Sequence, residues 1–289
     1  MAEFHSLNDV LSSGAEVEKV LSDFAFTEGP VFSRIGFLLF SDIPRNRIMK
    51  YTPGKPVEVF RENSNGANGN TFDHQGRLLT AEGGIAPGPG RVTRTEKNGS
   101  ITVLADKFEG KPLNAPNDLV YCVDGNIYFT DLRRRNEPAD SGKVGFSAVY
   151  QITRRGELRV ATREPIRPNG VALAANQQTL FVADTEGQNV RAYDLAPDGS
   201  LIRGRIVADL KAPQPGGPDG LKTDEEGNIY VASHGGVWAF NAAGARLGII
   251  QTPEQPANLA WGDNYRTLYI TARTSLYKVR LKVSGTRTF

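Results

Sequence analysis

The chain has 289 residues, of which 39% are hydrophobic and 23% are charged, a balance typical of a globular protein with a sizeable core. Lysine plus arginine (34) and aspartate plus glutamate (32) leave a net charge of +2, which gives no electrostatic case for a nucleic-acid or membrane partner. The one cysteine, Cys122, excludes an internal disulfide and a multi-thiolate metal site, and three histidines are too few for a histidine-rich zinc cage.

The beginning of the chain predicts no targeting segment. MAEFHSLNDVLSSGAEVEKV has no basic stretch followed by an apolar one, as a secretory signal would have. The apolar runs of the chain are only a few residues long, far short of the ~20 that cross a bilayer. We therefore expect a cytoplasmic protein in which residues 1–14 form a frayed arm or a short helix and residues 15–289 form a single domain.

The rest of the chain repeats one pattern: a polar anchor residue, a short apolar run, a turn, and a second apolar run that ends on a polar residue. The six repeats start at the anchors Glu28, Asn68, Asn117, Asn169, Asp219 and Asn258, which are 40, 49, 52, 50 and 39 residues apart. Turns such as DGN at 124–126 supply the glycine that a tight hairpin requires. Further runs such as LYKVRL at 276–281 alternate as strands with one buried face do.

Repeats of this length, each with about four strands, are typical of β-propeller blades. Six of them predict an all-β fold, a six-bladed β-propeller closed as one domain. The sixth repeat provides only about three strands, so the segment Ala15–Leu21 is expected to add the outer strand of the last blade. Closing the ring in this way removes the exposed sheet edges. A β-sandwich of similar composition is the alternative, and six repeats in phase argue against it.

The anchors carry the first chemical signal. The first strand of each propeller blade lines the channel, so the anchors should form a ring at one end of it. All six have a side-chain oxygen, as two carboxylates and four amides. Such oxygens suit Ca²⁺, Mg²⁺ or Mn²⁺, whereas buried carboxylates without compensation are costly. The ring therefore predicts a hard divalent cation, with Zn²⁺ able to replace it in assays; for any single anchor, ordinary turn chemistry is the alternative.

The second run of each repeat returns to the same end of the channel. Three of the residues that end these runs, Glu82, Asp131 and His234, are therefore expected beside the ring. Together with the anchors Asn68 and Asn258, they are candidates for contacting a substrate. Hydrogen bonding between blades is the structural alternative, to which we give equal weight. His234 could also shuttle a proton near neutral pH.

Four segments, FTEGPVF, NAPNDLV, RPNGVAL and GGPDGLK, resemble the signature segments of the SMP-30/gluconolactonase/luciferin-regenerating-enzyme family, in order and at blade spacing. The similarity extends from about Asp23 to Leu281, and NGNTFD at 68–73 is similar to its bacterial gluconolactonase branch. The resemblance implies a six-bladed propeller with one divalent metal ion, usually Ca²⁺, in the channel. By motif it implies a general base or nucleophile at Asp219 and a set of metal ligands: Glu28, Asn117, Asn169 and Asp219.

Two stretches depart from the family pattern where loops border the channel mouth. Gly83–Gly90 stands where relatives often have a histidine and a shorter loop, and we interpret it as a flexible lid. Arg133–Arg135 stands where many relatives have Pro-Pro-Tyr-Gly. This run either draws anionic substrates to the mouth or is a solvated charged surface.

These observations together predict a metal-dependent hydrolase that opens sugar lactones, with a small lactone or ester as its partner. Two alternatives stay open at this stage. One is hydrolysis of organophosphates or other esters at the same site, and the other is a non-catalytic propeller that binds a ligand around a structural metal. The sequence does not determine the oligomeric state.

Overall fold

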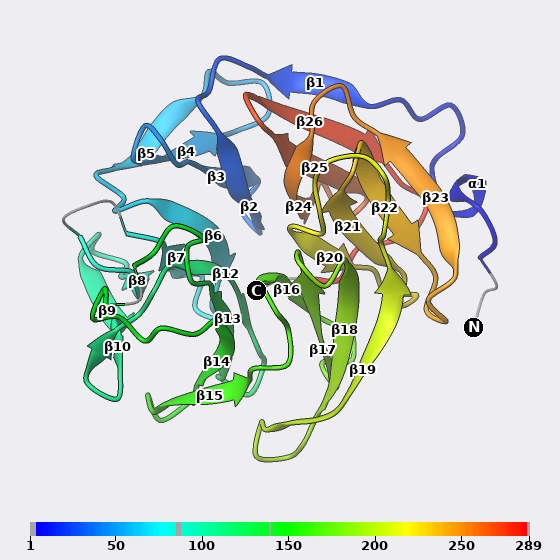
Figure 1. Ribbon diagram of the computed structural model, residues 1–289. Coiled ribbons are helices and arrows are strands. Elements are labelled where there is room, and N and C mark those ends of the chain that lie inside the picture. The colour runs from blue at the N-terminus through cyan, green and yellow to red at the C-terminus, as the bar shows by residue number, and fades with distance from the viewer. Residues whose placement is uncertain (1–3, 85–87, 139, 288–289) are drawn as a thin grey trace.

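The chain folds as a propeller of antiparallel sheets. A computed structural model describes residues 4–84, 88–138 and 140–287. In these residues six four-stranded sheets surround a central channel, and Figure 1 looks along that channel. The predicted all-β, six-bladed propeller is therefore confirmed. No helix in the described part of the chain is both long enough and apolar enough to cross a membrane.

Five blades consist of four consecutive strands, numbered from the channel outward. The first blade contains β2 (Thr27–Ser33), β3 (Phe37–Asp42), β4 (Arg47–Tyr51) and β5 (Glu58–Glu62). The second blade contains β6 (Ala67–Phe72), β7 (Leu78–Glu82), β8 (Arg91–Thr95) and β9 (Ile101–Ala105). A small hairpin follows, formed by β10 (Lys107–Phe108) and β11 (Lys111–Pro112).

The next three blades repeat the same order. They are β12 (Pro116–Tyr121), β13 (Ile127–Asp131), β14 (Ala148–Ile152) and β15 (Leu158–Thr162); β16 (Pro168–Leu173), β17 (Thr179–Asp184), β18 (Asn189–Leu195) and β19 (Leu201–Asp209); and β20 (Leu221–Thr223), β21 (Ile229–Ser233), β22 (Gly236–Phe240) and β23 (Arg246–Gln251).

The sixth blade joins the two ends of the chain. Its inner strands are β24 (Pro256–Gly262), β25 (Thr267–Ala272) and β26 (Ser275–Arg280), and β1 (Glu18–Leu21) pairs antiparallel with β26 at the outer edge. Figure 1 shows β1 in blue beside the red β26 at the rim. This confirms that an N-terminal strand closes the ring. The helix α1 (Leu7–Val10) precedes that strand, and the proposed domain boundary after residue 14 stays a prediction.

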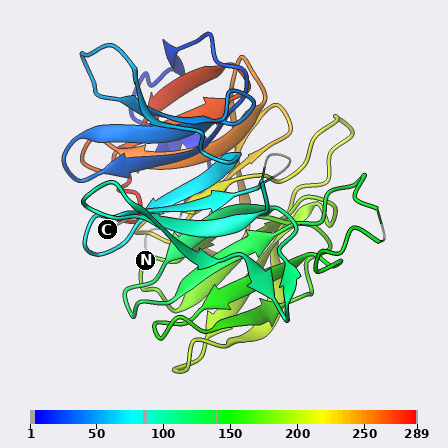
Figure 2. The same ribbon diagram turned by 90° about the vertical axis from the view of Figure 1, so that its left-hand side faces the viewer.

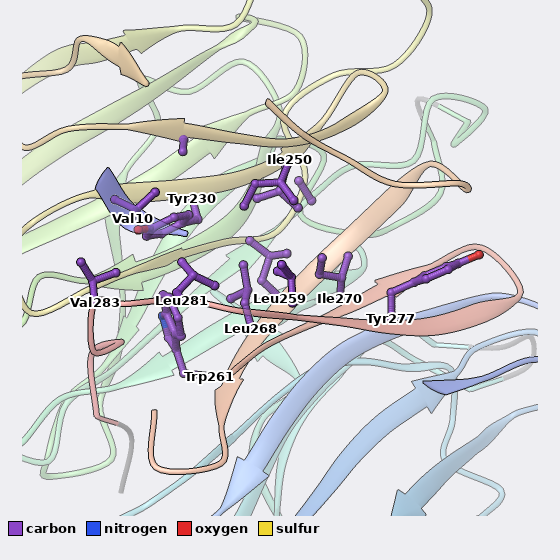
Figure 3. Packing of buried hydrophobic residues seen from close by; sticks show 14 of the residues in the cluster. Val10, Tyr230, Ile250, Leu259, Trp261, Leu268, Ile270, Tyr277, Leu281 and Val283 are labelled. Carbon is purple, nitrogen blue, oxygen red and sulfur yellow. The ribbon is translucent and has the colours of Figure 1, made fainter. Parts of the chain in front are cut away.

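Apolar side chains fill the space between neighbouring blades. Tyr230 of the fifth blade and Trp261 of the sixth meet edge to face at 5.4 Å, and Val10 of α1 joins the same cluster (Figure 3). Trp261 also donates its indole N–H to the carbonyl oxygen of Thr223 at 2.8 Å, so its polar edge is satisfied. Burial of each such large side chain contributes roughly 1.5–3 kcal/mol. This packing holds the inner strands, and hence the channel, in place.

Glu254 fastens the loop before the sixth blade to the turn between β25 and β26. Its carboxylate accepts hydrogen bonds from Thr274 N at 2.9 Å and Oγ1 at 2.8 Å, and from Tyr277 Oη at 2.9 Å. Burial raises the pKa of this carboxyl, but the hydrogen bonds from Ser275, Thr274 and Tyr277 outweigh it and lower the pKa to about 2. The stabilisation is therefore complete above the ordinary pKa of 4.5 and is lost as the pH falls toward 2.

We expect Glu254→Gln to lower the free energy of unfolding by about 1–3 kcal/mol at pH 7, because the amide loses the charge that strengthens these hydrogen bonds. The difference from the wild type should shrink as the pH is lowered from 5 to 3. Denaturant unfolding at several pH values measures it, with the exposed Glu62→Gln as control. A loss that stays constant with pH would contradict the ionised role of Glu254.

Candidate functional site

The inner strands bring the anchor residues to one end of the channel. Glu28, Asn68, Asn117, Asn169 and Asn258 lie near the beginning of the innermost strand of their blades, and Asp219 lies just before β20. In five of these strands the pairing register shifts at or next to the anchor, between residues 28 and 31, 67 and 70, 116 and 119, 168 and 171, and 256 and 258. Bulges of this kind redirect side chains and are common next to functional sites.

Glycines after the anchors let neighbouring blades approach closely. A Cβ atom on Gly29 would overlap the backbone of Asn68, and one on Gly220 would overlap the side chain of Asn258. The Gly220 N–H also donates to the carbonyl oxygen of Ala257 in the sixth blade at 2.8 Å. The anchors Asn68 and Asn258 are thus held against the backbone of the preceding blade, which fixes their positions in the ring.

The third blade has a carboxylate where four of the others have glycine. Asp118 follows the anchor Asn117, and its side chain is only 2% exposed. Its Oδ2 accepts from Val171 N in the fourth blade and from Asn258 Nδ2 in the sixth, each at 3.4 Å. Asp118 therefore reaches across the channel. The sequence analysis missed this residue, although a charged side chain at a position that is usually glycine is a usable signal.

The carboxylates in the channel carry like charges that repel one another. Burial and, after it, the negative charge of Asp118 together raise the pKa of Glu28 to about 7, against the hydrogen bond from the Gly29 N–H, which lowers it. Burial likewise raises the pKa of Asp219 well above its ordinary value, and the charges of Glu28 and Asp118 add to the effect. A bound cation would remove the cause of these shifts, because it would compensate both desolvation and mutual repulsion.

The surrounding donor atoms suit a hard cation. Asn68 Oδ1 is buried and has no hydrogen-bond partner in the structure. Asn169 Nδ2 donates to Thr185 Oγ1 at 3.2 Å, which orients that amide. No three His, Cys, Asp or Glu side chains of the described residues are close enough to hold a metal by themselves, so amide oxygens have to complete the set. Carboxylate and amide oxygens together fit Ca²⁺ or a similar ion.

Lys222 of β20 brings one positive charge to the same region. Its Nζ donates to Leu221 O at 3.0 Å and lies 3.5 Å from Asn258 Oδ1. The charge of Lys222 lowers the pKa of Glu28, although burial and Asp118 outweigh it. When ionised, the three carboxylates (−3) and the ammonium (+1) leave −2 in the channel. One divalent ion would balance that charge.

We expect Lys222→Met to raise the affinity of the protein for Ca²⁺ about tenfold, because it removes a repelling charge. The gain for a trivalent ion such as Tb³⁺ should be larger, about thirtyfold, since the Coulomb energy scales with the ion's charge. Calorimetry at pH 8.5, above the raised pKa of about 7 of Glu28, measures both affinities. Lys97→Met, in an exposed turn, is the control. Unchanged or weaker binding of both ions would show that Lys222 does not act through its charge.

The residues that end the second runs are engaged in structural contacts. Glu82 is fully buried and pairs with Arg61 at 2.5 Å and with Arg91 at 2.6 Å. Asp131 accepts from the backbone N–H groups of Asn114 at 3.0 Å and Ala115 at 2.7 Å. Burial raises the pKa of Asp131 to about 6 despite these hydrogen bonds. A role of Glu82 or Asp131 toward a substrate stays a prediction.

His234 lies between the fourth and fifth blades. Its side chain is 4% exposed, and its Nε2 lies 2.8 Å from Gln188 Oε1. Its Nδ1 is buried and has no hydrogen-bond partner in the structure. The hydrogen-bond partner of its ring is thus Gln188, and the place of His234 beside the ring of anchors stays a prediction.

The channel opens on one side and is narrow and covered on the other. An open pocket of about 550 Å³ lies over Asn68 and Asn117, and Gly83, Gly84 and Arg134 line it as well. Farther along the inner strands lies a cavity of only about 50 Å³. The C-terminal segment covers it: Thr286 donates its N–H to Thr223 O at 3.0 Å, and Figure 2 shows the C-terminus at the left-hand face of the propeller.

The loop predicted as a lid, Gly83–Gly90, is described only in part, because residues 85–87 lie outside the described residues. Of its described residues, Gly83 and Gly84 line the open pocket, and Gly88 and Pro89 line the adjoining one. Gly83 and Gly84 both accept hydrogen bonds from the guanidinium of Arg134, at 2.9 and 2.7 Å.

Comparison with known proteins shows which family this chain resembles over most of its length. The model of the SMP-30/Gluconolactonase/LRE-like region matches residues 26–274. A gluconolactonase of Zymomonas mobilis subsp. mobilis is 30% identical over an alignment that covers 96% of this chain and 85% of the relative. The diisopropyl-fluorophosphatase of Loligo vulgaris is 24% identical, with 88% of this chain and 87% of that protein covered.

Solved structures agree with this similarity. A gluconolactonase from Xanthomonas campestris superposes with a TM-score of 0.85 and 29% sequence identity, covering 96% of this chain and 93% of that one. A luciferin-regenerating enzyme superposes with a TM-score of 0.80 at 21% identity, covering 95% of this chain and 99% of that one, and at that identity the likeness concerns the fold alone.

Proposed function

This chain belongs to the SMP-30/gluconolactonase/LRE-like family, and from that premise we propose that it is a metal-dependent hydrolase that opens sugar lactones. The observation that carries the proposal is the group of buried carboxylates in the channel, Glu28, Asp118 and Asp219, where burial and mutual repulsion raise the pKa values of Glu28 and Asp219. The gluconolactonases among the relatives support lactones as the substrate class.

The cation would be held by the side chains of Glu28, Asn117, Asn169 and Asp219. The donor set contains only oxygen, which favours Ca²⁺ over softer ions. When bound, such an ion acts as a Lewis acid toward the ester carbonyl and is worth several kcal/mol of transition-state stabilisation. Asp118 would not need to bind the ion directly, because its carboxylate already accepts hydrogen bonds from Leu119, Val171 and Asn258. Its negative charge would still attract the ion.

Asp219 is the residue that we assign to the chemical step. As a general base its carboxylate takes one proton from water while the water oxygen bonds to the lactone carbonyl carbon. The ring C–O bond then breaks, and the proton passes to the leaving alkoxide oxygen, which gives the open hydroxy acid. A carboxylate that binds a cation has a lowered pKa and is a weaker base, so the cation would oppose the raised pKa that burial gives Asp219. Direct attack by Asp219 on the carbonyl carbon is the alternative.

The open pocket suits a substrate of this class. Its volume of about 550 Å³ is within the range of small-molecule sites. Asn68 and Asn117 lie at its floor and present polar groups to the hydroxyls of a sugar ring. The similarity to diisopropyl-fluorophosphatase keeps organophosphates as a second candidate class, which would use the same residues.

A panel of substrates separates these proposals. Purified protein is assayed with sugar lactones, simple carboxylic esters and an organophosphate, before and after removal of divalent ions with EDTA. The proposal expects lactones to be opened fastest, with loss of activity in EDTA and recovery on addition of Ca²⁺. Preference for the organophosphate would favour the second class, and no turnover of any substrate would leave a ligand-binding propeller.

A further inference from the structure

One arginine of the Arg133–Arg135 run stands apart from its neighbours. Arg135 forms an ion pair with Glu186 at 3.4 Å, and Arg133 donates from Nη2 to the carbonyl oxygen of Glu137 at 2.8 Å. Neither of these side chains lines the open pocket. Arg134 does line it, together with Asn68 and Asn117, the floor of the proposed substrate site.

Backbone carbonyls position the Arg134 guanidinium without neutralising it. Nη2 donates to Gly83 O at 2.9 Å and to Gly84 O at 2.7 Å, which ties the loop after β13 to the loop after β7. Both acceptors use the same nitrogen. In the described part of the chain no carboxylate lies within ion-pair distance of Arg134, and its guanidinium donates hydrogen bonds from Nη2 alone. The N–H group of Nε and the two N–H groups of Nη1 are thus left for a ligand.

Arg134 also determines the charge of the pocket. Among the described residues that line the open pocket, it is the sole charged side chain. The adjoining pocket contains an acidic residue, Glu137, but that carboxylate pairs with Lys143 at 3.2 Å. The open pocket therefore has the positive charge of Arg134 and no negative charge among its described lining residues.

We propose that Arg134 binds an anionic substituent of the substrate, so that the preferred lactones carry a carboxylate or phosphate remote from the reacting ester. This inference rests on the proposed lactone hydrolysis and narrows its substrate class. Arginine suits both anions because its charge strengthens the hydrogen bonds that Nε or Nη1 can donate to an oxygen of either one. A neutral sugar lactone would leave this charge without a partner.

The test compares three lactones: neutral glucono-δ-lactone, a lactone of a sugar diacid with a free carboxylate, and a phosphorylated gluconolactone. The wild type should have a higher kcat/KM for at least one anionic lactone than for the neutral one. Arg134→Gln should lower kcat/KM for that anionic lactone about 10- to 100-fold, the range of a charge-assisted hydrogen-bonded pair, and change the neutral lactone less than twofold. The effect should weaken at high salt.

Arg135→Gln is the matched control, since it removes the same charge from the next residue of the loop, outside the pocket. It should leave all three substrates unchanged. Equal loss on neutral and anionic lactones in Arg134→Gln would reduce Arg134 to a structural tie for the loop and overturn the proposal. Unchanged kinetics, or a wild type that prefers the neutral lactone, would overturn it as well. The carboxylate and phosphate arms tell which anion is recognised.

Binding separates this inference from the proposed hydrolysis. Calorimetry measures the affinity for a sugar diacid and for the corresponding monoacid. If no lactone is opened but Arg134→Gln weakens diacid binding at least tenfold and monoacid binding less than twofold, the anion site stands and only the hydrolase proposal fails. Equal affinities of wild type and variant for the diacid would overturn the anion site itself.

Discussion

Replacing Asp219 by asparagine is expected to lower kcat for lactone opening at least ~100-fold, the lower end of what a positioned base contributes. The amide keeps an oxygen that can bind a cation but cannot take a proton or attack the carbonyl carbon. Thermal stability should change little, because the variant also removes a buried charge that is repelled by Glu28 and Asp118. Steady-state kinetics at several metal concentrations measure the effect.

The metal dependence of that variant separates two roles. If Asp219 only binds the ion, saturating Ca²⁺ should restore most of the rate. If it acts on water or on the carbonyl carbon, the rate stays low at every concentration. Rescue to within a few-fold of the wild type would remove Asp219 from the chemical step, and a rate that never changed would place the reaction outside the ring.

The second large effect is expected for Gly29→Ala, which should lower the free energy of unfolding by about 2–4 kcal/mol. Gly29 has a φ of +52°, and an added Cβ would overlap the backbone of Asn68 in the next blade. The backbone has to shift, so Ca²⁺ affinity should fall together with stability.

Gly36→Ala is the matched control for this prediction. Gly36 also has a positive φ, +88°, but no atom lies within 4 Å of the place where its Cβ would be. Its replacement should therefore cost only the strain of the turn, about 1 kcal/mol. Denaturant unfolding compares the two variants. Equal losses would mean that the close approach of the blades at Gly29 does not constrain the ring.

Most of the fold could be predicted from the repeat pattern of the sequence. Periodicity and turn glycines define strands locally, and equal phase puts each anchor at the same level of its blade. The structure accordingly has Glu28, Asn117 and Asn169 in corresponding innermost strands. The missing strand of the last blade was equally predictable, because the sixth repeat ends early and only the N-terminal segment was left to complete it, as β1 does.

Contacts across the channel could not be predicted in the same way. Asp118 accepts hydrogen bonds from residues 53 and 140 positions away, and a repeat pattern says nothing about which side chains meet over such separations. Lys222 of β20 lies beside Asn258 of the next blade, a neighbour that the repeat pattern does not indicate. The difference among three consecutive arginines, of which Arg134 alone lines the open pocket, likewise depends on loops whose course no local pattern specifies.

The central claim is that one divalent ion, held by the ring, is required for hydrolysis, and a single titration tests it most directly. Metal-free protein is titrated with Ca²⁺ while the heat of binding and the rate of lactone opening are recorded, for the wild type and for Glu28→Gln. We predict one ion per chain, activity that rises in proportion to occupancy, and a shift of both curves to at least ~10-fold higher Ca²⁺ in Glu28→Gln, since a buried carboxylate ligand is lost. Full activity of the metal-free wild type, or binding curves that are identical in the two proteins, would contradict the claim.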